Sequence, residues 1–309
     1  MRRSPRPGGG QSDTGRWNRR SLGAERGGWL SAGADLGIFL ISLSAGVLGA
    51  LAGVGGGILV IPALTVVFGI DIRLAIGASI VSVIATSSGA AAAYVRDRLT
   101  NLRIGMFLEL ATTSGAVAGA LLTAIVAPQL LYVVLGVVLL LSAAMQLTRL
   151  GEELPPARSP SPMAQRLGLG DSYPDARLGR DVPYEPHRIP LGFVLMALAG
   201  LISGLLGIGS GALKVIAMDG AMRLPMKVSS ATSNFMIGVT AAASAGIYIG
   251  RGDVDVRIAS PVALGVLAGA FVGARLLGRL SNMHVRRIFV PVLAIIGIET
   301  ILRGFGLGL

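Results

Sequence analysis

The sequence predicts an all-α polytopic membrane protein with about eight transmembrane helices, arranged as two homologous four-helix halves. Three observations predict it: long uncharged segments, an internal repeat, and a glycine-rich break in the first helix of each half. Of the 309 residues, 52% are hydrophobic and only 14% are charged, whereas a soluble domain carries about 25% charged residues. Spanning a bilayer takes about 20 apolar residues. The segments without Asp, Glu, Lys or Arg are Leu36–Ile70, Leu74–Val95, Leu110–Thr148, Leu191–Leu213, Val228–Gly250 and Ile258–Ala274.

Polar stretches divide the chain into four parts. Residues 1–35, rich in Gly, Ser and Arg, are predicted to be a disordered basic N-terminal tail. Residues 36–148 form the first transmembrane repeat, 149–190 a Pro-rich polar linker with eight of the 15 prolines, and 191–309 the second repeat. We therefore expect a multi-pass protein of the cell membrane, as in a bacterial inner membrane.

Each repeat is predicted to cross the membrane four times. The crossings are Leu36–Ile70, Leu74–Val95, Ile104–Val126, Gln129–Thr148, Leu191–Ala217, Val228–Gly250, Ile258–Leu277 and Ile288–Leu302. The positive-inside tendency then favours a cytoplasmic N-terminus and linker. However, Arg279, Arg286 and Arg287 fall outside under this count. A re-entrant hairpin at each glycine break would change the count, so parallel and inverted repeats both remain open.

The internal repeat has a constant offset of 154 residues. Gly53-Val54-Gly55-Gly56-Gly57 then aligns with Gly207-Ile208-Gly209-Ser210-Gly211. The same offset aligns Ser79 with Ser233, Thr86 with Thr240, and Tyr94 with Tyr248. Apolar composition alone does not align such residues, so the match indicates a duplication. Duplicated halves with glycine-interrupted segments predict a secondary transporter, with its substrate site at the interface between the repeats.

The two glycine stretches are the first candidate binding elements. Four glycines in five residues would cost a continuous helix roughly 4 kcal/mol relative to alanine, so we expect a helix broken in mid-membrane. A helix that restarts there offers free N–H groups and a positive dipole end to an anion. The candidate residues are Gly55, Gly56, Gly57, Gly209, Ser210 and Gly211. The alternative is close helix packing, to which we assign the GxxxG pairs Gly115/Gly119 and Gly269/Gly273.

Polar residues inside the apolar segments are the second group of candidates. Lys214 stands where the first repeat has Val60, and a charge at mid-membrane needs a reason. It could pair with a substrate anion, or it could reach the interface or pair with Asp219. Four further side chains could hydrogen-bond an oxyanion or simply cap the backbone: Ser79, Thr232, Ser233 and Asn234. For Glu109 we favour an interfacial side chain over a proton-coupling carboxylate.

An enzyme is not expected. The two histidines, His187 and His284, fall in connections, and the sequence has no Cys and no Walker or HExxH motif. We therefore predict no catalytic residues, no metal site and no cofactor. The net charge of +11 lies at segment ends and in the polar stretches, which is typical of topology signals rather than of nucleic-acid binding.

The chain resembles the TauE/SafE family of membrane permeases. The resemblance rests on Gly53–Gly57 followed by Ile61-Pro62, on the Ala75-Ile76-Gly77-Ala78-Ser79 step that opens the next helix, and on Tyr94 with basic residues up to Arg103. It covers about residues 36–148 and 190–305. The second copy departs from the pattern at Ser210, Lys214 and Ile216. The resemblance implies transport of small, often sulfur-containing anions, driven by an ion gradient or a potential.

These features together predict a secondary transporter of a small anion such as sulfite, a sulfonate, another organosulfur anion or a carboxylate. Its partners are then the anionic substrate and the lipid bilayer, and not nucleic acid. Two alternatives remain: a carrier of cations or neutral solutes that uses carbonyls at the same breaks, and a non-transporting assembly or sensor subunit. Transport direction, coupling ion and oligomeric state are left open by the sequence.

Overall fold

The computed structural model describes residues 32–52, 57–96, 98–148, 161–175, 179–209, 211–277 and 282–307. The larger part of the predicted N-terminal tail, residues 1–31, lies outside this range. In chain order the elements are α2 Ala32–Ala52, α3 Gly57–Pro62, the π-helix η2 Ala63–Val67, α4 Ile72–Arg96, α5 Leu102–Leu122, α6 Pro128–Thr148, α7 Pro162–Arg166, β1 Asp171–Asp175, β2 Arg180–Tyr184, α8 Ile189–Leu206, α9 Gly211–Val215, the π-helix η3 Ile216–Ala221, α10 Met226–Arg251, α11 Val256–Leu277 and α12 Asn282–Gly304.

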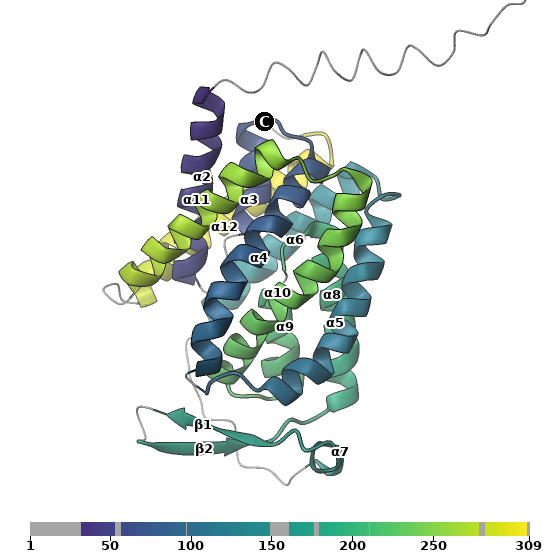
Figure 1. Ribbon diagram of the computed structural model, residues 1–309, viewed down its shortest axis with the longest axis vertical. Helices are drawn as coiled ribbons and strands as arrows, with labels where there is room; N and C mark the ends of the chain where they lie inside the picture. Colours follow the sequence, from purple (N-terminus) through teal and green to yellow (C-terminus); the bar gives the residue numbers. More distant parts are fainter. Residues whose placement is uncertain are drawn as a thin grey trace, which may run out of the picture.

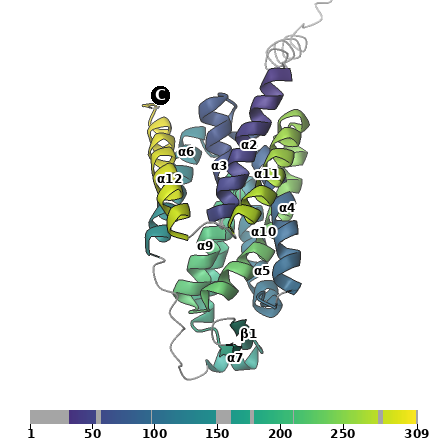
Figure 2. The same cartoon turned by 90° about the vertical axis from the view of Figure 1, so that its left-hand side faces the viewer.

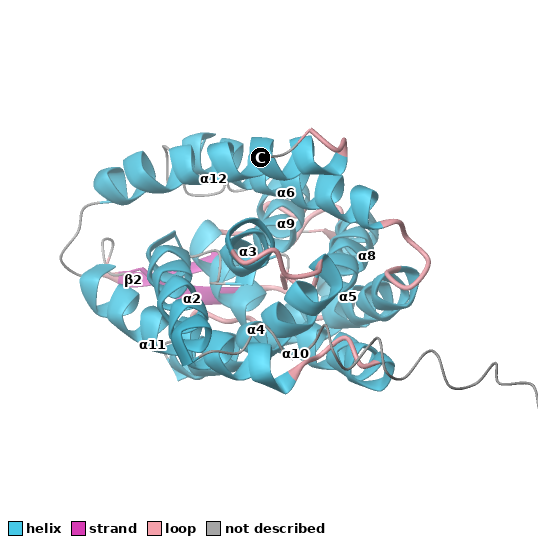
Figure 3. Ribbon diagram, turned by 90° about the horizontal axis from the view of Figure 1, so that it is seen from above, coloured by secondary structure: helices cyan, strands magenta, loops and turns pink. Residues whose placement is uncertain are grey.

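The fold is that of an all-α polytopic membrane protein, as predicted, with a small β-hairpin in the described part of the linker. Five helices among the described residues are long and apolar enough to cross a membrane: α2, α5, α6, α8 and α11. Helices α3 and α9 lie in the middle of the bundle when it is viewed from above (Figure 3). The long helices surround these two short ones, so the segments that follow the two glycine stretches lie innermost in the bundle.

The first segment of each half is a helical hairpin, which corrects the prediction of a single broken crossing. Phe68, which follows η2, lies beside Gly37 near the start of α2, where an added Cβ would be 3.4 Å from its ring. In the second half, Met222 after η3 lies in the same way beside Gly192 near the start of α8. Gly207 ends α8 in the left-handed conformation, with φ of 62°, which terminates a helix and lets the chain turn back.

The two hairpins enter the bundle from opposite ends. One end, called the linker end, joins the α4–α5 turn to the linker, since Asn101 Nδ2 donates to the hydroxyl of Tyr184 at 2.9 Å. The other end, called the terminal end, holds Arg73, which donates to the carbonyl of Val126 at 3.3 Å, and Arg303, which donates to that of Thr65 at 2.8 Å. The α2 hairpin opens at the terminal end and the α8 hairpin at the linker end (Figure 1). Equivalent segments of the two halves therefore run in opposite directions.

The start of α2 and the β-hairpin of the linker lie at opposite ends of the bundle, which differs from the arrangement that eight crossings predict. Helix α2 begins at the terminal end, whereas the β-hairpin of the linker covers the opposite end (Figure 1). The physical reason is the hairpin itself. It returns to its own end of the bundle, so three long helices follow it in each half, α4, α5 and α6 in the first and α10, α11 and α12 in the second, instead of an even number.

Helices of one half pack mainly against helices of the other. The pairs are α2 with α11, α5 with α8, and α6 with α12, of which the last stands at one side of the bundle (Figure 2). Gly115 and Gly119 of α5 lie against α8, where a Cβ on Gly119 would overlap the carbonyl oxygen of Leu201. Gly269 and Gly273 of α11 lie in the same way against α2. These contacts confirm the assignment of both GxxxG pairs to packing.

The linker contains ordered structure where the sequence predicted only a polar connection. Strands β1 and β2 pair antiparallel, with Asp171 opposite Tyr184. The rings of Tyr173 and Tyr184 are buried with centroids 6.2 Å apart. Burial raises the pKa of the Tyr184 hydroxyl, so it stays protonated as the acceptor of the Asn101 amide. The many prolines and charges of this stretch predicted a plain linker, although two of its aromatic residues anchor it to the bundle.

Candidate functional site

The two hairpin tips meet at one serine near the centre of the bundle. The hydroxyl of Ser79 on α4 lies 3.1 Å from the carbonyl oxygen of Gly57 and 3.1 Å from that of Gly207. Gly57 begins α3, and Gly207 follows α8, so residues far apart in the sequence share this contact. The equivalent residue of the second half, Ser233, donates to the carbonyl of Gly211 at 3.1 Å. The structure thus brings the described residues of both glycine stretches together.

The described glycines of the tips are covered by apolar side chains in this conformation. A Cβ on Gly209 would lie 2.8 Å from Ile237 and 2.9 Å from Val83, and one on Gly211 would lie 2.7 Å from Ile237. Gly57 is also closed off, by Val83. These glycines therefore serve close packing between the tips and helices α4 and α10. The expectation of backbone open to an anion is not met at these three positions. Gly55, Gly56 and Ser210 lie outside the described residues.

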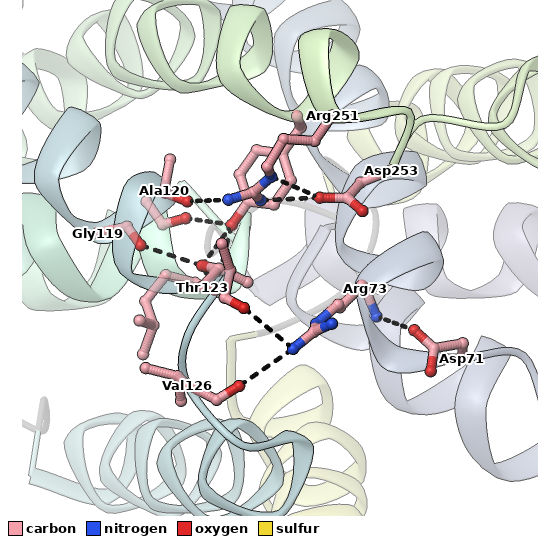
Figure 4. A network of polar contacts seen from close by, with 12 residues as sticks. Asp71, Arg73, Gly119, Ala120, Thr123, Val126, Arg251 and Asp253 are labelled. Carbon is pink, nitrogen blue, oxygen red and sulfur yellow. Dashed lines mark hydrogen bonds and ion pairs between the residues drawn. The ribbon is translucent and has the colours of Figure 1, made fainter.

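The carbonyl groups at the end of α8 already have protein donors. A helix leaves its last carbonyls without partners inside the helix. Here the hydroxyl of Tyr248 donates to the carbonyl of Gly204 at 2.5 Å, and Thr123 donates to that of Leu205 at 3.0 Å. The two hydroxyls also contact each other at 2.9 Å. The network continues through Arg251 to Asp253, beside a second one around Arg73 (Figure 4).

Lys214 is fully buried on α9, three residues after the second glycine stretch. Its side chain is 0% exposed, so it does not reach the membrane interface. The Nζ atom donates to the hydroxyl of Thr240 on α10 at 2.6 Å. Of the alternatives considered for this lysine, the structure excludes the interfacial one. A buried ammonium beside the meeting point of the two hairpins is the strongest candidate for a binding group.

Glu109 completes this buried network and corrects its interpretation as an interfacial residue. Its Oε1 atom accepts from Thr240 at 2.7 Å and from Thr113 at 2.8 Å. Its Oε2 atom is buried and has no hydrogen-bond partner among the described residues. Position 109 is near the start of α5, which led to the expectation of an interfacial side chain. The packing of α5 against α10 brings it instead to the lysine of the other half.

The other predicted polar residues do not join Lys214. The hydroxyl of Thr232 accepts from the backbone N–H of Asn101 at 3.1 Å, at the linker end. The Asn234 amide donates to the carbonyl of Ser230, one turn earlier on its own helix, at 3.1 Å. Sequence reasoning missed Thr240 and Glu109 as site residues. The signal that could have found Glu109 is the offset of 154, which places Ala263 opposite it, as Val60 stands opposite Lys214.

The fold and this network define an all-α multi-pass membrane protein with inverted halves and a buried charged site between them. The model of the sulfite exporter TauE/SafE family matches residues 38–300, and the chain belongs to this family of membrane transporters. The chain is 26% identical to the probable membrane transporter protein YunE of Bacillus subtilis (strain 168) over 275 residues, which cover 86% of this chain and 97% of YunE.

Two further proteins of the same organism give similar matches. The probable membrane transporter protein YdhB is 27% identical over 262 residues, which cover 84% of this chain and 98% of YdhB. The probable membrane transporter protein YjnA is 28% identical over 272 residues, which cover 85% of this chain and 98% of YjnA. No solved structure gives a significant match.

Proposed function

We propose that this protein is a secondary transporter of a small anion, bound beside Lys214 where the two hairpins meet. The observation that carries the proposal is the complete burial of this lysine between the halves. An ammonium inside a membrane protein costs at least about 2.5–3.5 kcal/mol, and intramembrane charges mark substrate or ion pathways. The names of the family and of the three relatives, a sulfite exporter family and probable membrane transporters, point the same way.

The arrangement of the hairpins supports an alternating-access mechanism. Each hairpin opens toward one end of the bundle, and both tips contact Ser79 at the centre. A movement of one hairpin against α4 and α10 would expose the central site to one side only, as in other transporters with inverted repeats. Lys214 lies on α9, directly after the second tip, so such a movement would carry the binding charge with it.

The chemistry of the site favours an oxyanion of small size. A single ammonium with neighbouring hydroxyl groups matches sulfite, a small sulfonate or another organosulfur anion, or a carboxylate. The alternative of a cation carrier through backbone carbonyls receives less support. The carbonyls of Gly204, Leu205 and Gly207 already accept hydrogen bonds from Tyr248, Thr123 and Ser79.

Flux into proteoliposomes tests the proposal directly. We expect purified protein to transport at least one of sulfite, ethanesulfonate and acetate well above empty liposomes, and not to transport potassium or glycerol. Lys214→Met is expected to lower the flux by about tenfold or more, since a hydrogen bond to a charged group contributes about 1.5–3 kcal/mol.

The matched control is Lys227→Met, which changes the only other lysine of the chain. It lies in the first turn of α10, away from the network, and we expect flux near that of the wild type. Equal effects of the two substitutions would remove Lys214 from the substrate site. A wild-type protein that moves none of these anions would support a non-transporting subunit instead.

A further inference from the structure

We propose that Glu109 is the proton-carrying partner of Lys214, so that each anion bound at the lysine is accompanied by one proton on Glu109. This inference rests on the proposed anion transport and adds its coupling ion. It makes the protein an anion–proton symporter. The three residues Lys214, Thr240 and Glu109 are called the relay below.

Protonation of Glu109 can change which acceptor the Thr240 hydroxyl uses. Lys214 Nζ donates to Thr240 Oγ1 at 2.6 Å, and Oγ1 lies 2.7 Å from Glu109 Oε1 and 2.8 Å from the carbonyl of Met236. A hydroxyl has one hydrogen. It can point to the carboxylate, as an ionised Glu109 requires, or to the Met236 carbonyl when a protonated Glu109 no longer needs it. Both acceptors are in place, so the threonine can serve either state.

The charges of the relay balance only while no anion is bound. Lys214 and Glu109 are neutral as a pair across the Thr240 hydroxyl. An anion that binds Lys214 neutralises its positive charge. An ionised Glu109 is then left without a compensating charge in a medium of low dielectric constant. Uptake of one proton restores neutrality. Glu109 Oε2, buried and without a partner among the described residues, is the free position for that proton.

Other charged groups lie too far along their helices to compensate the charge of Glu109 in place of Lys214. Helices α8 and α10 pack against α5. Helix α8 has no charged residue, and α10 carries Lys227 in its first turn and Tyr248 and Arg251 in its last two turns. On α5 itself the only other charge is Arg103, which lies in the first turn and donates to the linker carbonyl of Gly168 at 3.2 Å. Asp219 lies on the π-helix that follows α9, at its linker-end side.

The equivalent positions of the internal repeat show that the fold does not require the two charges. At the offset of 154, Val60 stands for Lys214 and Ala263 for Glu109, while Thr86 stands for Thr240. Thr86 donates to the carbonyl four residues earlier, Ser82, at 3.0 Å, as Thr240 can to Met236. The threonine thus has a common structural role in both halves. The two charges occur together at one of the two equivalent sites and are both absent from the other, which indicates a function of the pair rather than of the packing.

The experiment separates proton movement from anion movement. Wild-type, Glu109→Gln and Glu299→Gln proteins are reconstituted with a pH-sensitive dye inside, and the membrane potential is clamped with potassium and valinomycin. Glu299 is the matched control, since it is a second acid in an apolar helix but pairs with Arg303 at 3.1 Å. The probes are sulfite, ethanesulfonate and acetate. Because sulfite and acetate carry protons themselves, proton movement is compared between variants at equal anion flux.

The expected results differ sharply between the variants. In wild-type and Glu299→Gln proteins, a gradient of one pH unit should sustain about a tenfold accumulation of the anion on the alkaline side when one proton moves with each anion. Glu109→Gln should still exchange the anion down its own gradient but lose the accumulation driven by pH. Accumulation by Glu109→Gln equal to that of the wild type would overturn the symport proposal while leaving anion transport intact.

Failure of the proposed function has a different signature: either the wild type shows no anion flux, or Lys214→Met leaves the flux unchanged. If Glu109→Gln does not fold, proton uptake by detergent-solubilised wild-type protein on addition of ethanesulfonate or sulfite, in weakly buffered solution, gives the second measurement. Binding of the anion without proton uptake would then overturn the inference. Proton uptake that disappears in Lys214→Met would support it.

Discussion

Ser79 joins the two hairpins through its hydroxyl. It lies 3.1 Å from the carbonyl oxygen of Gly57 and 3.1 Å from that of Gly207. Gly207 follows the end of α8, where carbonyls have no helical partner. The equivalent residue Ser233 bonds Gly211 of its own half, and the repeat equivalent of Gly207, Gly53, lies outside the described residues. The stability of the central junction should therefore depend on Ser79.

Ser79→Ala is expected to lower stability by about 1–3 kcal/mol, the cost of leaving a buried acceptor unsatisfied. The exposed Ser88 on the same helix as Ser79 bonds the carbonyl of Ile84 at 2.8 Å, and Ser88→Ala should be nearly neutral. Loss of helical circular dichroism on heating in detergent measures both. Equal shifts for Ser79→Ala and Ser88→Ala would argue against a role for Ser79 at the junction.

At the scale of single residues, the sequence identified the unusual charge of Lys214 but not the residues with which it pairs. Lys214 stands out in the sequence because an apolar segment has no reason to contain it. Its partner Thr240 lies on another helix, and Glu109 belongs to the other half. The position of Glu109 near a helix start indicates an interfacial residue only when the helix is considered alone. Packing between the halves decides its surroundings, and packing is not visible in one helix.

At the scale of elements, glycines fall into two groups that the sequence does not separate. Some lie where another backbone approaches, as Gly119 does against the carbonyl of Leu201. Others have open space beside them: a Cβ added to Gly246 on α10 would meet no atom within 4 Å. Both are helical glycines in apolar segments. Only the partner helix distinguishes them.

Gly119→Ala and Gly246→Ala form a matched pair that tests the packing of α5 on α8. The first should destabilise the protein by about 1–3 kcal/mol, since the backbones must separate to admit the methyl group. The second should be neutral or should stabilise by up to about 1 kcal/mol, because alanine favours a helix over glycine. Thermal unfolding in detergent compares them. A neutral Gly119→Ala would show that α5 and α8 are not in close contact in the folded protein.

The same limit explains the hairpins. The sequence predicts where each helix breaks, because glycine stretches disfavour a continuous helix, and the breaks at 53–57 and 207–211 agree with the ends of α2 and α8. It does not say whether the chain continues or turns back after a break, since both paths bury equally apolar residues. Contacts such as Phe68 with Gly37 decide between them, and no local pattern encodes a contact between residues so far apart in the chain.

At the scale of the whole molecule, the hairpins decide which parts of the chain share a side of the membrane. Helix α12 packs antiparallel to α6, with Gly304 at its end against the carbonyl of Gln129 at the start of α6. The start of α12 therefore lies at the linker end. This end also holds Arg103, which donates to the linker carbonyl of Gly168 at 3.2 Å. We infer that the linker end is cytoplasmic and that the start of α2 is not.

Single-cysteine labelling tests this topology without background, because the natural chain has no cysteine. Three exposed positions serve as probes: Gly33 near the start of α2, Ser172 on β1 and Leu307 after α12. With the hairpins, Gly33→Cys and Leu307→Cys react from one side of the membrane and Ser172→Cys from the other. With eight crossings, all three would react from the same side, since the tail, the linker and the C-terminus are each separated by an even number of crossings.

The measurement is the reaction of each variant with a membrane-impermeant maleimide, in intact cells and in inside-out vesicles. We expect Ser172→Cys to be labelled in inside-out vesicles only, and the other two in intact cells only. The cysteine-free wild type gives the blank, and labelling after detergent treatment shows that each cysteine is reactive. Labelling of Gly33→Cys and Ser172→Cys from the same side would contradict the hairpin at α2. It would also remove the opposed directions of the two halves, on which alternating access at Ser79 and Lys214 depends.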